Sequence, residues 1–315
     1  MNASASSPLA PASAAVPAAS IWRLRAARLR RDRAAVAAGA VLLVLLVLCF
    51  AVPPLAAALG VDGTTTDLLK RFDEPSAEHW LGNDEAGRDV LVRLLIGGQT
   101  SLSIGLLGAL GCTLVGTVIG ACAGYFRGRV DMVLMRFTDF MISMPSLPLL
   151  IILAAVDLSK LGVPETFIKS GSAAYWRIIL IVTLLGWTGV ARLVRASTLA
   201  LTEREFVMSA RAQGGGAWWI LTRHVLPNAI SPVIVATTLA MGRIMLTESG
   251  LSFLGVGIQP PLTSWGAMLT NAQDLMASAP ALALYPGALI FLTVVAINFL
   301  GDGLQSAFDP RSDPR

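Results

Sequence analysis

Six long apolar runs dominate this sequence, and they constrain its fold more than any other feature. Each run has roughly the 20 apolar residues that one helix needs to cross the hydrocarbon core of a bilayer. Hydrophobic residues make up 55% of the 315 residues and charged residues only 14%, whereas a soluble domain has about 25% charged residues. The chain is therefore predicted to be an all-α polytopic membrane protein with about six transmembrane helices. The predicted helices cover roughly residues 34–59, 98–124, 132–156, 176–197, 228–251 and 286–304.

The basic residues lie mainly beside these runs, on alternate connecting segments. If the N-terminus is in the cytoplasm, most arginines and lysines fall on the cytoplasmic side, as the positive-inside rule requires. The sequence therefore predicts an N-in, C-in topology, with residues 60–97 outside and residues 203–227 and 306–315 in the cytoplasm. The net charge of +4 does not indicate a nucleic-acid partner, because the charge flanks the apolar runs.

The first 33 residues divide into an uncharged part and a basic part. Residues 1–20 are rich in Ala, Ser and Pro, and this composition is typical of disorder. Residues 21–33 contain six arginines among apolar residues, which predicts an amphipathic helix on the cytoplasmic membrane surface. A basic block before an apolar run also occurs in secretory signals, but the uncharged run over 34–61 is too long for one. This run is therefore interpreted as a retained first transmembrane helix.

Two groups of residues inside the predicted helices favour packing roles. Gly116, Gly120 and Gly124 recur every four residues on one helix face, so they favour close helix packing, with lining of a substrate path as the alternative. Arg136 and Asp139 are three residues apart, and this spacing predicts a pair on one face of the third predicted helix.

Arg243 and Glu248 are charged residues within the fifth predicted helix. Ionisable side chains in a membrane usually face the bundle interior or water, and a separation of five residues places these two poorly for a direct pair. Structural partners on other helices and contact with a transported solute are the two interpretations. The three cysteines lie inside apolar runs and have no metal-ligand spacing; they are Cys49, Cys112 and Cys122.

A charged segment over residues 203–228 separates the fourth and fifth predicted helices and must lie in water. Three consecutive glycines, Gly214–Gly216, break its helical pattern, since each costs roughly 0.8–1 kcal/mol against alanine in a helix. The segment predicts a short helix over Glu203–Gln213 and a turn at Gly214, where a residue without a Cβ reaches left-handed backbone angles. Pro227 is expected at the start of the next helix, where it needs no amide donor.

The same segment resembles the cytoplasmic coupling loop of ABC importer permeases. The family pattern is Glu-Ala-Ala, three residues, Gly, nine residues, a hydrophobic residue, any residue and Leu-Pro. The spacing fits throughout, although Met208 stands for the Glu and Ser209 for the first Ala. His224 stands at the hydrophobic position, as in the peptide and nickel branch. The residues expected to contact an ATPase subunit are Met208, Ser209, Ala210, Arg211, Gly214, His224, Leu226 and Pro227.

Other motifs extend the resemblance over residues 78–311. The string His79–Asp89 resembles the His-x-Leu-Gly-Thr-Asp-x-x-Gly-Arg-Asp signature of the dipeptide, oligopeptide and nickel permeases, with Asn83 in place of Thr. A metal site on the His and acidic residues of this string is the alternative, which Arg88 disfavours as a ready counter-charge. The strings Glu248–Gly257 and Asn298–Leu304 match later motifs of the same branch, in particular of its second permease.

The resemblance implies a type I ABC importer permease fold, with residues 98–305 as the core domain. It also implies a multi-pass subunit of the bacterial inner membrane. Its implied partners are a second homologous permease, two ATP-binding cassette ATPase subunits and an extracytoplasmic solute-binding protein. Peptides are the expected cargo, with glutathione and nickel chelates as alternatives. Pro260, Pro261 and Trp265 are expected to face the binding protein, and an aromatic belt at the membrane edge is the alternative for Trp265.

The sequence predicts a transport subunit and not an enzyme. It lacks a Gly-x-x-x-x-Gly-Lys-Ser/Thr phosphate loop, so hydrolysis of ATP is expected only in partner subunits. No cofactor and no bound metal are predicted, and the two histidines lie on opposite sides of the predicted membrane. A secondary transporter or channel that works without an ATPase is the alternative, although the predicted helices contain neither a series of acidic residues nor an internal repeat.

Overall fold

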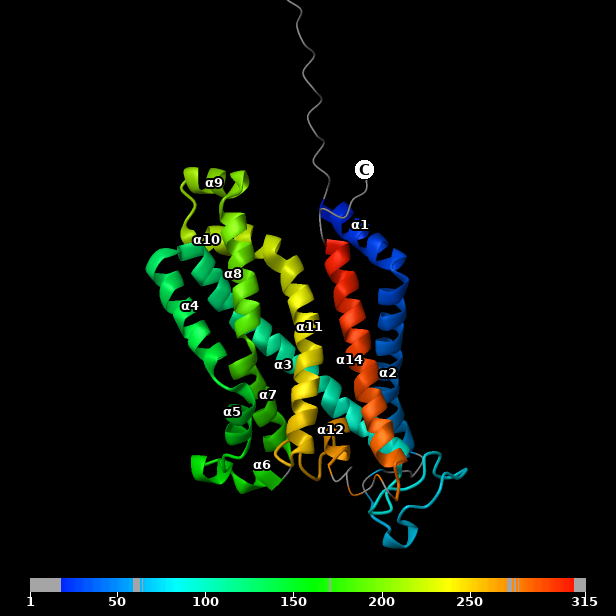
Figure 1. Ribbon diagram of the computed structural model, residues 1–315. Helices are drawn as coiled ribbons and strands as arrows, with labels where there is room; N and C mark the ends of the chain where they lie inside the picture. The colour runs from blue at the N-terminus through cyan, green and yellow to red at the C-terminus, as the bar shows by residue number, and fades with distance from the viewer. Residues whose placement is uncertain are drawn as a thin grey trace, which may run out of the picture.

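The computed structural model describes residues 18–58, 63, 65–169, 171–270, 274, 276 and 278–308, and the described residues contain no β-strand. They form a bundle of long helices with shorter helices at both ends (Figure 1). The N-terminal helices are α1 (Ala18–Arg31), α2 (Arg33–Ala58), α3 (Val90–Phe126), α4 (Gly128–Ser143), α5 (Ser146–Ala154) and α6 (Glu165–Lys169). The remaining helices are α7 (Ser172–Gly186), α8 (Thr188–Thr202), α9 (Glu205–Ala212), α10 (Ala217–Ile220), α11 (Leu226–Phe253), α12 (Trp265–Met268) and α14 (Ala281–Phe308).

Four helical stretches are long and apolar enough to cross a membrane, and there are up to six such spans if each of two bent helix pairs counts as one. The described helices therefore confirm the predicted all-α membrane fold. The bent pairs, each of which the sequence predicted as one span, are α4 with α5, at 83°, and α7 with α8, at 44°. Pro145 explains the first bend, because the residue before a proline avoids the helical region. Met144 accordingly has φ −73° and ψ 137°.

Helix α3 begins at Val90, eight residues before the predicted helix start at 98, so residues 90–97 are helical. Asp89 caps this helix and accepts a hydrogen bond from the Val92 amide at 2.8 Å. Arg93 is accommodated because its guanidinium pairs with the Asp84 carboxylate at 3.1 Å. With 37 residues, α3 is about 55 Å long, and it crosses the bundle obliquely (Figure 1).

The three-glycine face of α3 packs against α8, which confirms the predicted packing role. A Cβ added to Gly116 would lie 2.7 Å from the Trp187 carbonyl oxygen, and one added to Gly120 would lie 2.3 Å from the Ala191 carbonyl oxygen. A Cβ added to Gly124 would lie 2.7 Å from the Thr198 Cβ. Any larger side chain at these positions would push the two helices apart.

Ion pairs join α4 to α8, and they correct the predicted pair of Arg136 with Asp139. Arg192 Nη2 lies 2.6 Å from Asp139 Oδ1. Arg195 Nη2 donates to Asp131 Oδ2, also at 2.6 Å. Residue spacing within one helix cannot predict these pairs, because both arginines belong to α8, in the next span, and both aspartates belong to α4.

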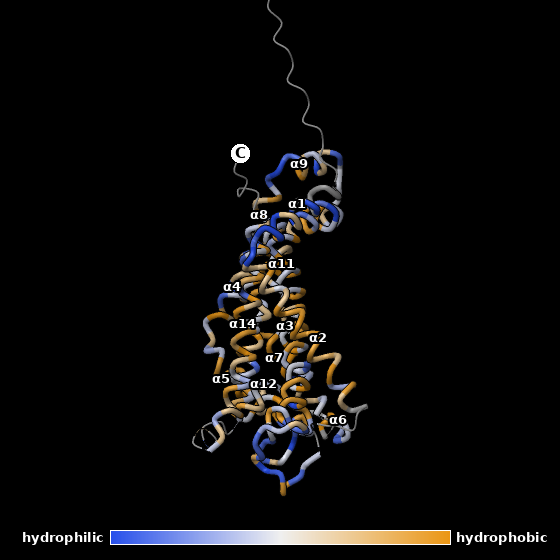
Figure 2. The backbone as a smooth tube through the Cα atoms, turned by 90° about the vertical axis from the view of Figure 1, so that its right-hand side faces the viewer, coloured by the Kyte–Doolittle hydropathy of each residue, from blue (hydrophilic) through white to orange (hydrophobic). Residues whose placement is uncertain are grey.

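The polar segments lie at the two ends of the bundle, and the apolar stretches lie between them (Figure 2). Helices α1 and α9 and the Phe308 end of α14 share one end, while α6, α12 and residues 65–89 share the other (Figure 1). Helix α1 contacts α14, with the Arg25 guanidinium 4.8 Å from the Phe308 ring centroid. Residues 18–20 are the first turn of α1 and not disordered as predicted. The disorder expected for residues 1–17, and the tail over 309–315, lie outside the described residues.

Candidate functional site

The segment that was predicted to couple to an ATPase begins where α8 ends, at Thr202. Arg127, from the end of α3, donates hydrogen bonds to Thr202 Oγ1 and Glu203 Oε1, both at 3.0 Å. Glu203 therefore belongs to a turn that is tied to α3, and α9 begins two residues later than predicted, at Glu205. This contact joins the turn before α9 to the end of α3.

Helix α9 presents one buried and one exposed face. Val207 and Ala210 are buried and pack on a cluster that includes Ile220 and Leu221. The predicted contact residues Met208, Ser209 and Arg211 are exposed, whereas Ala210 is buried. The predicted set therefore divides into residues that hold α9 in place and residues that face outward from it.

The turn after α9 has the predicted geometry. Gly214 has φ +82°, which is the left-handed region. Its amide donates to the Arg211 carbonyl, and the Gly215 amide donates to the Ala210 carbonyl, both at 3.0 Å. These bonds satisfy carbonyl groups at the end of α9, as a glycine cap does. A Cβ at Gly214 would meet no atom of the described residues within 4 Å, so its surroundings are open.

A continuous helical stretch joins the turn to the fifth span. Helix α10 runs into a π-helical segment over Leu221–Val225 and then into α11, so that residues 217–253 form one stretch of 37 residues. Pro227 lies in the first turn of α11, as predicted. A proline removes one amide donor and displaces the carbonyl four residues before it, which explains the wider π turn at this point. His224 and Leu226 are half-buried, and Pro227 is exposed.

Large aromatic side chains are exposed beside α9, and they lie outside the set of contact residues predicted from the sequence. Phe206, Trp218 and Trp219 have exposed fractions of 42%, 62% and 53%. The ring centroids of Trp219 and His224 lie 4.8 Å apart in an edge-to-face contact. We call Phe206, Met208, Trp218 and Trp219 the aromatic patch. The sequence signal that could have indicated it is the pair of adjacent tryptophans beside the glycine break in a segment expected in water.

Trp265, at the opposite end of the bundle, corrects one prediction. Its side chain is completely buried, and its Nε1 donates to the Leu94 carbonyl at 2.7 Å. It therefore lies neither on a docking surface nor in an aromatic belt. The loop before α12 folds back between the helices and inserts this ring, while Pro260 and Pro261 stay exposed.

A buried carboxyl group organises this folded-back loop. Glu248 is completely buried, and its carboxyl oxygens accept hydrogen bonds from Ser264 Oγ at 2.6 Å, Ser252 Oγ at 2.8 Å and Ser101 Oγ at 3.3 Å. The Ser101 hydroxyl also accepts a bond from the Trp265 amide. Glu248 therefore has structural partners, and it joins α11 to α3 and to the loop before α12.

The acidic residues of the outer string have arginine or histidine partners. Asp84 Oδ2 lies 2.9 Å from Arg88 Nε and 3.1 Å from Arg93 Nε. His79 Nδ1 lies 2.9 Å from Asp89 Oδ2. Arg88 is thus the counter-charge that the sequence indicated. These contacts fold residues 79–93 into a compact cap over the start of α3.

Comparison with known proteins assigns the family. Residues 116–314 match the model of the binding-protein-dependent transport system inner membrane component. Residues 20–72 match the N-terminal TM domain of oligopeptide transport permease C, so the similarity includes the first span.

Three relatives illustrate this similarity. The glutathione transport system permease protein GsiD of Pectobacterium atrosepticum is 38% identical over 92% of this chain and 91% of its own length. The dipeptide transport system permease protein DppC of Alkalihalophilus pseudofirmus is 34% identical over 93% and 91%. The oligopeptide transport system permease protein OppC of Bacillus subtilis is 33% identical over 93% and 90%. The chain therefore belongs to the binding-protein-dependent inner membrane components, as a multi-pass permease of the ABC peptide and glutathione importer family and not as an enzyme.

Proposed function

We propose that this chain forms half of the translocation path of an ATP-driven importer of short peptides and couples to an ATPase subunit through residues 203–227. The observation that carries the proposal is the aromatic patch on and beside α9. The Phe206 and Trp219 rings both lie beside His224, with ring centroids 6.4 and 4.8 Å from its ring. Exposed apolar groups that gather outside the membrane indicate a protein interface, and aromatic residues are typical anchors of such interfaces. The patch adjoins the glycine turn that the family pattern marks.

The geometry supports a simple route for force. An ATPase that moves α9 also moves residues 217–253, because the turn at Gly214 is short and the helix beyond it is continuous. Arg127 joins the end of α3 to the turn that precedes α9. Closure of the ATPases would thus shift the fifth span against the third and fourth. We assign the α9 end to the cytoplasm, which gives the N-in, C-in topology.

The remaining partners belong at the other surfaces. A second, homologous permease would complete the path, and a binding protein would deliver cargo at the opposite end, where Pro260 and Pro261 are exposed. Peptides are the proposed cargo because DppC and OppC relatives carry dipeptide and oligopeptide names. A GsiD relative carries a glutathione name. Identification of the ligand held by the co-purifying binding protein decides between peptides, glutathione and a nickel chelate.

The test of coupling uses the assembled transporter. Phe206→Asp places a charge in the patch, and a charge buried without a partner costs several kcal/mol. We expect at least a tenfold loss of ATPase co-purification and of binding-protein-stimulated hydrolysis. Leu69→Asp is the matched control, because Leu69 is 95% exposed at the opposite end, and it should retain the ATPases. Uptake that persists without any ATPase subunit would favour the secondary transporter instead.

A further inference from the structure

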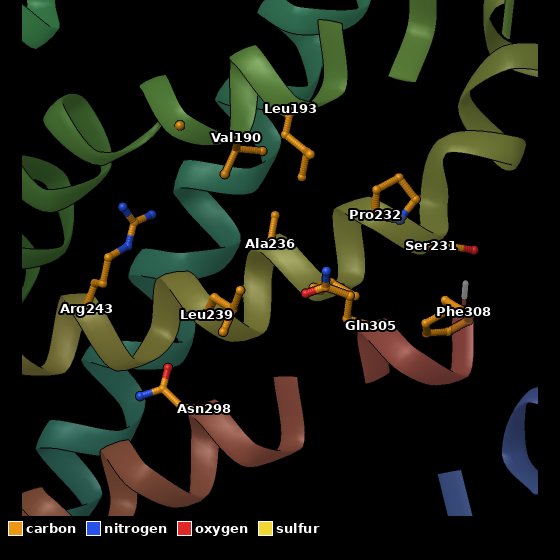
Figure 3. A pocket seen from close by; sticks show the side chains of 12 residues that line it. Val190, Leu193, Ser231, Pro232, Ala236, Leu239, Arg243, Asn298, Gln305 and Phe308 are labelled. Atoms are coloured by element: carbon orange, nitrogen blue, oxygen red, sulfur yellow. The ribbon is translucent and has the colours of Figure 1, made fainter. Parts of the chain in front are cut away.

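A cavity of about 610 Å³ lies between α8, α11 and α14 (Figure 3). This volume is in the range of sites for small solutes, roughly 300–1,000 Å³. Its wall is largely apolar, with Val190, Leu193, Ala236, Leu239 and Phe308 among the lining residues. A peptide-sized molecule therefore fits the space that this chain leaves beside its fifth span.

The charged and polar side chains that line the cavity give it a net positive charge. Arg243 is the cation of the set, and the neutral side chains of Ser231, Asn298 and Gln305 accompany it. None of the described residues that line it is acidic. Arg243 is exposed, and within the part of the chain that the structure describes its guanidinium has no ion-pair partner. The cavity is thus electropositive.

The position of Arg243 along α11 gives its charge a high free energy in the membrane. At 1.5 Å per residue, it lies about 15 Å from the Phe253 end of the helix and about 25 Å from the Leu226 end. An arginine in the middle of a bilayer costs roughly 2.5–3.5 kcal/mol or more, so such residues face water or a bound partner. Arg243 also lines a second cavity of about 240 Å³, beside α5 and α7. It therefore stands where two cavities meet.

We propose that Arg243 is an anion subsite of the transport path, and that its guanidinium binds the carboxylate of the cargo during passage. The inference rests on the proposed import function and adds the chemical class of the ligand. A guanidinium matches a carboxylate with two parallel hydrogen bonds. Carboxamides such as those of Asn298 and Gln305 both donate and accept hydrogen bonds, as a peptide backbone requires. Peptides and glutathione both carry a free carboxylate.

The test measures the charge preference of the cavity in the assembled transporter. Cys49, Cys112 and Cys122 are replaced by Ala, and Leu239→Cys, one helical turn from Arg243 in the cavity lining, supplies a reporter thiol. The rates of reaction with an anionic and a cationic methanethiosulfonate reagent are then compared. We expect the ratio of anionic to cationic rate to fall at least fivefold in Arg243→Gln and to remain in Arg243→Lys. Arg136→Gln is the matched control, because Arg136 is exposed and lies outside the cavity lining.

Protection of the reporter tests the carboxylate itself. Millimolar trialanine should slow the labelling of the reporter more than trialanine amide does, and Arg243→Gln should abolish this difference. An unreactive reporter, an unchanged rate ratio in Arg243→Gln, or equal protection by both peptides would overturn the proposal. Equal protection is also the result expected if an acidic side chain of the second permease occupies Arg243. Binding-protein-stimulated ATPase activity, measured in parallel, reports the proposed function separately, since labelling needs no ATP hydrolysis.

Discussion

At the scale of single residues, Gly214 gives the sharpest test of the coupling segment. Its left-handed backbone and open surroundings accept Asp or Asn, which tolerate positive φ better than most residues. We expect Gly214→Asp to insert and fold but to lose ATPase co-purification and uptake, at least tenfold, because the charge faces the docked subunit. Gly214→Asn is isosteric and neutral, so it should retain more of both. Normal ATPase binding and uptake in Gly214→Asp would remove the segment from the mechanism.

Met208 gives a graded control at the same scale. It replaces the Glu of the family pattern and is 52% exposed. If the family Glu is not required here, Met208→Glu should be close to neutral, whereas the shorter Met208→Asp brings the charge nearer the helix and should be the more damaging change. Co-purification of the ATPases with both variants at equal expression checks this order.

Trp265 belongs to the core and not to a docking surface, and its substitution should show this. Removal of a buried aromatic side chain costs about 3–5 kcal/mol, and the Leu94 carbonyl also loses its indole donor. We expect Trp265→Ala to lower the thermal unfolding temperature and the yield of folded protein. Trp218→Ala, at a position 62% exposed, should leave unfolding unchanged and weaken only ATPase binding. Wild-type stability of Trp265→Ala would contradict its buried placement.

These residues show what local pattern does and does not predict. The glycine turn followed from residue type alone, because few other residues adopt its backbone angles. The burial of Trp265 did not, since it depends on a loop that Glu248 holds through three serines from different parts of the chain. The partners of Asp131 and Asp139 were likewise hidden, because they lie more than fifty residues away.

At the scale of elements, the contact of α3 with α8 should be intolerant of even one methyl group. A Cβ on Gly120 would lie 2.3 Å from the Ala191 carbonyl oxygen. This oxygen is a backbone atom, so relief of the clash requires a shift of the helix backbone. Overpacking of this kind costs about 1–3 kcal/mol. We expect Gly120→Ala to lower the unfolding temperature of the detergent-solubilised protein. Gly287→Ala in α14 is the matched control, since its Cβ would meet no atom within 4 Å in the part of the chain that the structure describes. Equal stability of the two variants would argue against this packing.

The elements themselves were largely predictable, and their ends and bends were not. Hydropathy located all six apolar stretches because the bilayer requires a minimum length of each. It placed the start of α3 too late, since a polar side chain such as Arg93 is acceptable in a helix only when a distant partner such as Asp84 neutralises it. The kink at Pro145 was visible in the sequence as a proline, but its 83° angle depends on how α5 packs against α7.

At the scale of the whole molecule, the separation of two polar ends predicts the orientation in the membrane. Residues 65–89 and α6 lie at one end, while α1 and α9 lie at the other (Figure 1). The arginines of α1 belong in the cytoplasm by the positive-inside rule, so the end that contains residues 65–89 and α6 should face outward.

Reporters fused after Gly87 and after Lys160 should therefore read outside, and one fused after Gly215 should read inside. The Lys160 fusion also tests whether the bent pair of α4 and α5 crosses the membrane as one span. The topology requires an alkaline phosphatase reporter to be active only at the first two sites and a fluorescent cytoplasmic reporter only at the third. The same side for Gly87 and Gly215 would contradict the six-span arrangement, and an inside result at Lys160 would mean that α4 and α5 enter and leave on the cytoplasmic side.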